Sequence, residues 1–377
     1  MVKRNRLKTS TKIKYRTNKL GQTEVSFNWL YVLVAGGVIL LFFFGVVMKQ
    51  KAVAQNQLTA DVVNILESIL TGAGVSEKTK NIVDTGGLVD FTLYFHCEDG
   101  LGEYGIEGQN ARAQIPIEPV FSPLRLKTAQ MITWSLPYKL PFKVIDFLYV
   151  TSANTKYYLL GESSDFSLEF MNATQGFNVQ KISVSQYPQI DPGKNFQIRF
   201  ISLDGGGLLS QTIPPKIVQM DDSAVSAVVF TGSNQVDYYT KNGRSWEKMN
   251  QNTVSIISLG GERDAAKYAA IFSGDDKNYL CNMHKAFARL EFVNQIYSSK
   301  AEGLMSYYQS NPLASATGGC LGYLSEASEN LKGKLSTFKV QNQVCLRQIG
   351  SCPELISTAQ QLSNLNTAMS SSCLPLY

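Results

Sequence analysis

The stretch WLYVLVAGGVILLFFFGVVM, Trp29–Met48, decides the architecture of this chain. It contains neither a charged residue nor a proline, and thirteen of its residues are Leu, Ile, Val or Phe. As a helix rising about 1.5 Å per residue it is roughly 30 Å long, which matches the hydrocarbon core of a bilayer. Those thirteen side chains favour membrane insertion by on the order of 5 kcal/mol. The sequence therefore predicts one membrane-spanning helix over residues 29–48.

The charges that flank this stretch predict its orientation. Residues 1–20 hold eight basic side chains and no acid, whereas only Lys49 and Lys51 follow directly. Because basic segments stay in the cytoplasm, we expect residues 1–28 to be a basic cytoplasmic leader and juxtamembrane segment. The C-terminal part is then extracytoplasmic, as in a single-pass protein of the cell membrane. A cleaved secretory signal fits less well, because the apolar run exceeds the usual length of about 7–15 residues.

The remainder of the chain has a different charge balance. The formal net charge of the whole chain is +5, but residues 52–377 hold 25 basic and 29 acidic side chains. The positive charge therefore belongs to the N-terminal segment, which argues against nucleic acid as a partner of the body.

All six cysteines follow the apolar stretch. An even number of cysteines confined to an exported region is typical of disulfides formed in an oxidising compartment. Five of the six lie in the last hundred residues, so we expect the C-terminal region to be cross-linked. The spacing leaves the pairing open, and buried free thiols are the alternative. The candidate disulfide cysteines are Cys97, Cys281, Cys320, Cys345, Cys352 and Cys373.

Helical periodicity continues beyond the membrane stretch. Leu58, Val62, Leu66 and Ile69 recur at three or four residues, and the pattern ends at the glycines of 72–74. Residues 49–75 are therefore predicted to form a helical stalk, either as a new helix or as an unbroken continuation.

The predicted fold is a transmembrane helix followed by an α+β or α/β ectodomain with a helical, cysteine-containing C-terminal region. The ectodomain consists of two regions. Residues 76–262 form the β-rich α/β part, in which 142–150 is the strongest buried strand and prolines such as Pro137 mark turns. Ile217–Met220 is assigned to the series of strands, which permits a Rossmann-like or a mixed sheet. Residues 263–377 are helical, with leucines 321, 324, 331 and 335 on one helix and Pro353 opening the last.

Signals for chemistry are weak. The glycine-rich segments 204–207 and 260–261 are interpreted as turns or connections in preference to phosphate sites. A Cys281/His284 metal pair and a Cys97/His284 thiol–imidazole couple are possible in principle, but cysteines in disulfides beside incidental histidines are favoured. No catalytic, cofactor-binding or metal residue is assigned, no cofactor is expected, and the chain is not predicted to be an enzyme.

The segment before the apolar stretch reads KLGQTEVSFN, residues 19–28. A basic leader, a small residue, a short polar segment and a long apolar helix follow one another in this order. Over about residues 19–48 the chain resembles the N-terminus of type IV pilin-like proteins, especially archaeal ones. The resemblance implies cleavage after Gly21, Gln22 as the new N-terminus, and Glu24 as the partner of a neighbouring subunit's amino group.

Together these observations favour a cell-surface structural or interaction protein, as a subunit of a type IV filament or of a secretion-type assembly. Its expected partners are the lipid bilayer and other membrane or surface proteins, including further copies of itself. A membrane-tethered binding receptor is the alternative, and an extracytoplasmic enzyme the third hypothesis.

Overall fold

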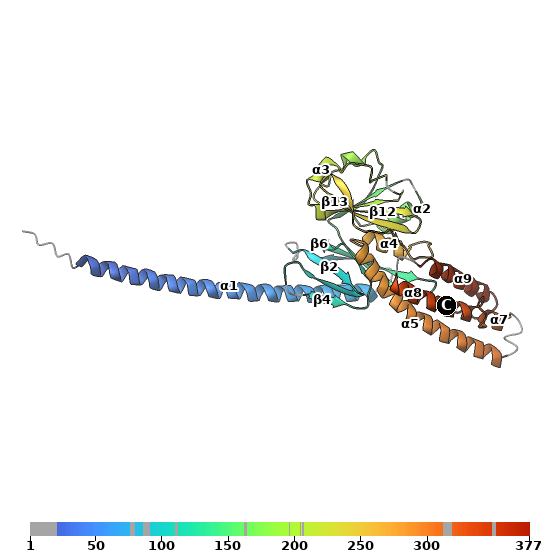
Figure 1. Ribbon diagram of the computed structural model, residues 1–377. Helices are drawn as coiled ribbons and strands as arrows, with labels where there is room; N and C mark the ends of the chain where they lie inside the picture. The colour runs from blue at the N-terminus through green and yellow to red at the C-terminus, as the bar shows by residue number, and fades with distance from the viewer. Residues whose placement is uncertain are drawn as a thin grey trace, which may run out of the picture. The chain divides into compact units, whose positions relative to one another are not determined.

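The computed structural model describes residues 21–75, 80–85, 91–109, 112–161, 164–195, 197–203, 205, 207–311, 319–348 and 352–377. The chain divides into two compact units, Met1–Leu58 and Thr59–Tyr377. Figure 1 shows the chain as a ribbon and labels many of its helices and strands.

The first unit consists of helix in its described part. Helix α1 extends over Gly21–Val75, so the segment 49–75 is helical without a break. Within it, Trp29–Gln50 has a mean hydropathy of 2.7 over 22 residues and is long and apolar enough to cross a membrane. Its large side chains are exposed, among them Tyr31 at 73% and Leu41 at 72%. The prediction of one apolar N-terminal helix is therefore confirmed.

The C-terminal turns of α1 belong to the second unit and pack against a four-stranded sheet. Val62, Val63, Leu66 and Leu70 are buried against the apolar face of this sheet, and Ile69 lies at the edge of the cluster. The three- and four-residue spacing seen in the sequence therefore produces a buried helix face. The strand order is β4-β3-β2-β6, with bounds β2 (Leu93–Glu98), β3 (Leu101–Ile106), β4 (Arg112–Ile115) and β6 (Arg125–Leu126).

A second four-stranded sheet has the order β1-β7-β8-β5. The predicted strand 142–150 is confirmed as β8, but β7 includes Pro137, which was expected to mark a turn. Strand β1 pairs with β7 only as far as Trp134. Pro137 therefore lies beyond this pairing, where the edge of β7 that faces β1 has no strand partner among the described residues. Because no strand accepts a hydrogen bond there, the N–H that proline lacks is not missed. The bounds are β1 (Lys80–Asp84), β5 (Val120–Phe121), β7 (Gln130–Lys139) and β8 (Lys143–Ser152).

The third sheet is mixed and has the order β10-β9-β11-β12-β13-β14, with β15 paired to β13. Its first four strands are parallel, and β13 and β14 are antiparallel. The sequence permitted either a Rossmann-like sheet or a mixed sheet, and the structure has the mixed sheet. The bounds are β9 (Thr155–Leu160), β10 (Val179–Ile182), β11 (Gln197–Ser202), β12 (Val225–Gly232), β13 (Gln235–Asn242), β14 (Ser245–Lys248) and β15 (Val254–Ser255).

Helices cover both faces of the mixed sheet. One face packs with α2 (Asp165–Ala173) and α4 (Ala265–Phe272), and the other packs with η2 (Tyr187–Gln189) and α3 (Pro215–Val218). The assignment of Ile217–Met220 to a strand was wrong, because Pro215 at the first turn fixes a helical φ. A short helix, η3 (Asp222–Ala224), precedes β12.

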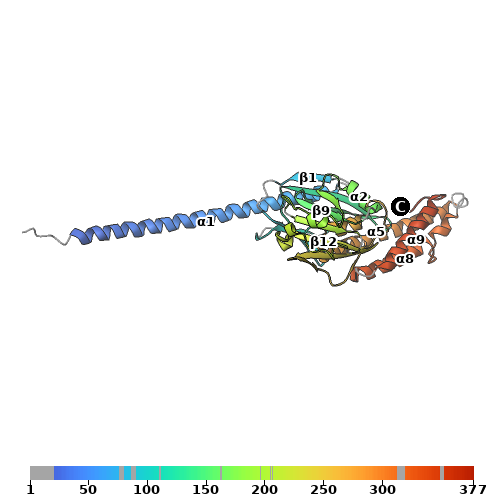
Figure 2. The same ribbon diagram turned by 90° about the horizontal axis from the view of Figure 1, so that it is seen from above.

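The C-terminal helices share the largest hydrophobic core with the sheets, so this core extends across the connection near residue 262. In both views α5, α8 and α9 lie side by side (Figures 1 and 2). Buried asparagines join α5 and α8: the Asn294 amide donates to the carbonyl of Leu335 at 3.1 Å, and Asn342 to that of Phe287 at 3.0 Å. The leucines assigned to one helix lie on two, and the helix opened by Pro353 is confirmed. The bounds are α5 (Asp276–Ser310), α7 (Cys320–Leu324), α8 (Leu331–Arg347) and α9 (Pro353–Ser370).

Candidate functional site

The residues named for leader processing lie at the start of α1. Gly21 is its first residue, and Gln22 and Glu24 follow in its first turn. The side chains of residues 21–28 are outside the described part of the chain, so cleavage after Gly21 and the role of Glu24 stay predictions.

The six cysteines form three disulfides. Cys320 pairs with Cys373, and Cys345 with Cys352, which cross-links the helical region as expected. Cys97 pairs with Cys281, with 5.7 Å between their Cα atoms and a sequence separation of 184. The expectation of disulfides is confirmed, and the alternative of free thiols is wrong.

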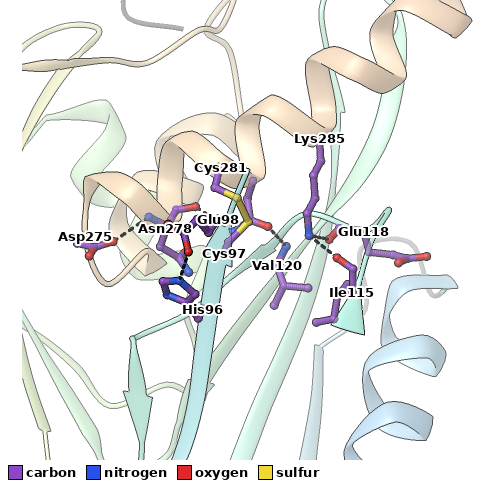
Figure 3. Close-up of a disulfide and its surroundings, with 11 residues drawn as sticks. His96, Cys97, Glu98, Ile115, Glu118, Val120, Asp275, Asn278, Cys281 and Lys285 are labelled. Carbon is purple, nitrogen blue, oxygen red and sulfur yellow. Dashed lines mark hydrogen bonds and ion pairs between the residues drawn. A yellow bond between two sulfur atoms is a disulfide. The ribbon is translucent and has the colours of Figure 1, made fainter. Parts of the chain in front are cut away.

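The Cys97–Cys281 disulfide joins β2 to the first turns of α5 (Figure 3). Both sulfurs are therefore unavailable to His284, so the Cys281/His284 metal pair and the Cys97/His284 couple are ruled out. His284 instead lies against the β2–β3 turn, where a Cβ on Gly100 would be 3.1 Å from its Nδ1. Asp99 and Gly100 have φ values of 50° and 79°, which a two-residue hairpin turn requires.

One helical turn beyond Cys281, Lys285 enters the same junction (Figure 3). Its side chain is buried, and its Nζ donates to the carbonyl oxygens of Ile115 at 2.6 Å and Glu118 at 3.2 Å. Burial lowers the pKa of Lys285 to about 8, because the charged ammonium loses hydration there. The ammonium thus serves as a structural donor to two backbone carbonyls.

Two further contacts hold α5 to the strands on the helix face that carries Cys281 and Lys285. The side-chain oxygen of Asn282 accepts a hydrogen bond from the backbone N–H of Val120 at 3.0 Å. Gly102 provides space for the lysine, since a Cβ at this position would lie 2.7 Å from the Nζ of Lys285. The disulfide, the ammonium and the amide therefore form one clamp between α5 and the sheets.

A cavity of about 360 Å³ lies at the amino ends of β9, β11 and β12. Arg199 of β11 forms part of its wall and is only 6% exposed. Its Nε donates to the carbonyl of Ile271 at 3.2 Å, and its terminal nitrogens donate to Ser226 Oγ at 3.0 Å, to the Ser273 carbonyl at 2.5 Å and to the Gly274 carbonyl at 3.3 Å. The guanidinium thus caps the C-terminus of α4.

Sequence reasoning assigned no role to this cavity. The available signal was Arg199 itself, the one charged residue inside the apolar strand β11. A buried charge interrupting an apolar strand costs free energy unless neighbouring groups compensate it, and such a position is a useful pointer to a site.

A second cavity, of about 300 Å³, lies beside the connection from β15 to α4. Gly260 and Gly261 adopt φ values of 75° and 105° there. Asp264 caps α4, since its Oδ1 accepts from the backbone N–H groups of Ala266 at 3.1 Å and Lys267 at 3.4 Å. The helix N-terminus is therefore filled by its own carboxylate, as in an ordinary strand-to-helix connection. Burial raises the pKa of Asp264.

The other glycine-rich segment, 204–207, follows β11. Gly205 has a φ of 75°, as a tight turn requires. Residues 204 and 206 are outside the described residues, so the interpretation of this segment as a turn stays a prediction.

No family model matches this chain, and no match is found among the curated proteins or the solved structures.

Proposed function

We propose that this protein is a single-pass cell-surface protein, anchored by the apolar part of α1, that works as a structural or interaction subunit. The exposed apolar surface of Trp29–Gln50 carries the proposal. A soluble monomer rarely exposes a continuous apolar patch of more than a few hundred Å². The length of this segment matches the thickness of the hydrocarbon core of a bilayer, and its apolar side chains suit contact with lipid.

Two further observations support the direction of insertion. The eight basic residues of 1–20 favour a cytoplasmic N-terminus. The three disulfides all lie in the second unit, and such bonds persist in an oxidising, extracytoplasmic compartment. Both observations favour an extracytoplasmic location of residues 59–377.

Protease protection tests the topology. The full-length chain carries a different epitope at each end and is expressed in bacterial cells, which are converted to spheroplasts and treated with protease. We expect loss of the C-terminal epitope and protection of the N-terminal one. A variant in which the basic residues of 1–20 are replaced by glutamine should lose this preference, whereas neutralising Lys49 and Lys51 should strengthen it. A protected C-terminal epitope, or recovery of the chain as a monodisperse protein without detergent, would contradict the proposal.

If the protein is a filament subunit, its leader must be cleaved after Gly21. Sequencing of the N-terminus of the mature protein should give Gln22 as the first residue. The variant Gly21→Leu should retain the leader, and Glu24→Gln should be processed but should fail to assemble. A mature chain that begins at Met1 excludes a cleaved filament subunit and leaves an uncut surface anchor.

A membrane-tethered binding receptor is the second candidate function. The cavity beside Arg199 favours it, because pockets of about 300–1,000 Å³ with a few convergent polar groups are typical of small-molecule sites.

A further inference from the structure

The cavity at the amino ends of β9, β11 and β12 is enclosed by segments that are distant in sequence. Its walls include the end of α4 and the turn that follows it, together with the loop 123–125. Gly274 brings these two segments together: its N–H donates to the Ser122 carbonyl at 2.9 Å, and a Cβ at Gly274 would lie 2.7 Å from the backbone nitrogen of Leu124. The enclosure is therefore built by close backbone packing.

The charged side chains that line the cavity are of one sign. Among the described residues that line it are two arginines, Arg125 and Arg199, and no carboxylate. Arg125 is half-exposed and forms an ion pair with Glu107 at 2.5 Å. Arg199 is buried and forms no close ion pair among the described residues, and Asp275 is the carboxylate that acts on it at longer range.

The acceptors around Arg199 are all neutral. Three are backbone carbonyls at the end of α4, and the fourth is the hydroxyl of Ser226. The C-terminal end of a helix offers only about half a negative charge. A guanidinium has five N–H donors, and the four hydrogen bonds leave one donor for a further acceptor. The wall of the cavity therefore includes a buried cation whose close partners are all neutral, whose nearest charge interaction is the longer-range one with Asp275, and which keeps one N–H donor without a partner among the described residues.

The other lining groups indicate the kind of molecule that fits. Leu124, Tyr157, Ile198 and Phe272 provide an apolar surface, and the rim carries the half-exposed Met249. Polar groups gather near the strand ends at Thr155, Gln197, Ser226 and Thr240. We infer that this cavity binds a small organic acid, with its carboxylate on Arg199 and its apolar body against the aromatic and aliphatic wall. The inference does not depend on the membrane topology proposed above.

Matched acid and amide probes test this inference. The full-length protein is placed in nanodiscs of phosphatidylcholine, and binding of 4-phenylbutyrate and of 4-phenylbutyramide is measured by calorimetry and by ligand-observed NMR, with empty nanodiscs as the blank. The two probes share an apolar body and differ in charge. We expect the acid to bind about tenfold more tightly than the amide or better, because a charge-assisted hydrogen bond is roughly twice as strong as a neutral one.

Two variants separate charge from shape. Arg199→Gln should reduce the affinity for the acid to that for the amide. Ala224→Met fills the cavity without altering Arg199 and should abolish binding of both probes. The matched control is Ser233→Met, which places the same side chain at an exposed turn between β12 and β13 and should bind as the wild type does. Thermal unfolding of each variant shows whether the fold persists.

Three outcomes would overturn the inference. They are equal affinity for acid and amide, binding that survives Ala224→Met in a folded protein, and absence of binding of either probe at millimolar concentration. Because the proposed topology is tested by protease protection and the cavity by these probes, failure of one leaves the other unaffected.

Discussion

Replacing the buried lysine of the α5 clamp, as Lys285→Met, should change how the stability of the second unit depends on pH. The ammonium is 5% exposed, and burial lowers its pKa from 10.5 to about 8. Between these two values the unfolded chain binds more protons than the folded chain, so the free energy of unfolding rises with pH. From about pH 7 to about pH 9.5 this gain amounts to about 2 kcal/mol in the wild type.

The variant cannot titrate at this position, so it should lack the gain. Near pH 7 two effects oppose each other. The methionine removes a poorly hydrated charge, but it leaves the carbonyls of Ile115 and Glu118 without their donor, at about 1–3 kcal/mol for each buried acceptor that stays unpaired. The informative quantity is therefore the difference between wild type and variant, which should grow by about 2 kcal/mol over this pH range in favour of the wild type.

Urea unfolding of the full-length protein in detergent micelles, followed by tryptophan fluorescence, measures this difference. Trp134 is 2% exposed in the main core and reports on the second unit. The control is Lys277→Met, which removes an exposed lysine from the same helix and leaves the contacts of Lys285 in place. Buried tyrosines titrate equally in both proteins and cancel. Parallel curves of wild type and Lys285→Met across this pH range would refute the reasoning.

Three further predictions concern the cross-link and the two cavities. Replacing Cys97 and Cys281 by alanine should lower the free energy of unfolding by about 5 kcal/mol in the same urea assay, because the disulfide closes a loop of 184 residues; an unchanged midpoint would contradict this. Gly274→Ala should destabilise by about 2 kcal/mol, because its Cβ would meet the backbone of Leu124, and a neutral effect in thermal unfolding would show that the loop can move. The contribution of Asp264 to stability should fall as pH rises above 3.8, its ordinary pKa, because burial raises the folded pKa of this carboxyl; Asp264→Asn keeps the cap and should remove this contribution, and equal slopes of wild type and variant would count against it.

Much of the secondary structure was predictable because it depends on local pattern. The buried face at the end of α1 was visible in the spacing of its apolar residues, and the buried strand β8 in its composition, and both are observed. The errors occurred where the neighbours of a segment decide its structure. Pro137 lies inside β7 because one edge of that strand has no partner there in the described part of the chain. Ile217 lies in a helix because a proline at its first turn outweighs its β propensity.

The sites were predictable only in part. The sequence indicated that the cysteines form disulfides, because their number and their position follow from the compartment. It did not indicate that Lys285 would be buried beside one of them, since a lysine on a helix is normally exposed. The cavity at Arg199 was missed altogether, because its walls come from β9, β11, β12, the end of α4 and the loop 123–125.

By itself, the sequence determined that one long apolar helix precedes an acidic, cysteine-bearing body, because hydropathy and charge are properties of consecutive residues. Only the tertiary structure decided which cysteines meet and which polar groups converge. Cys97 pairs with a partner 184 residues away, and Arg199 reaches carbonyls more than seventy residues distant. Such contacts arise when apolar faces pack together, and packing is a property of whole surfaces that no local periodicity encodes.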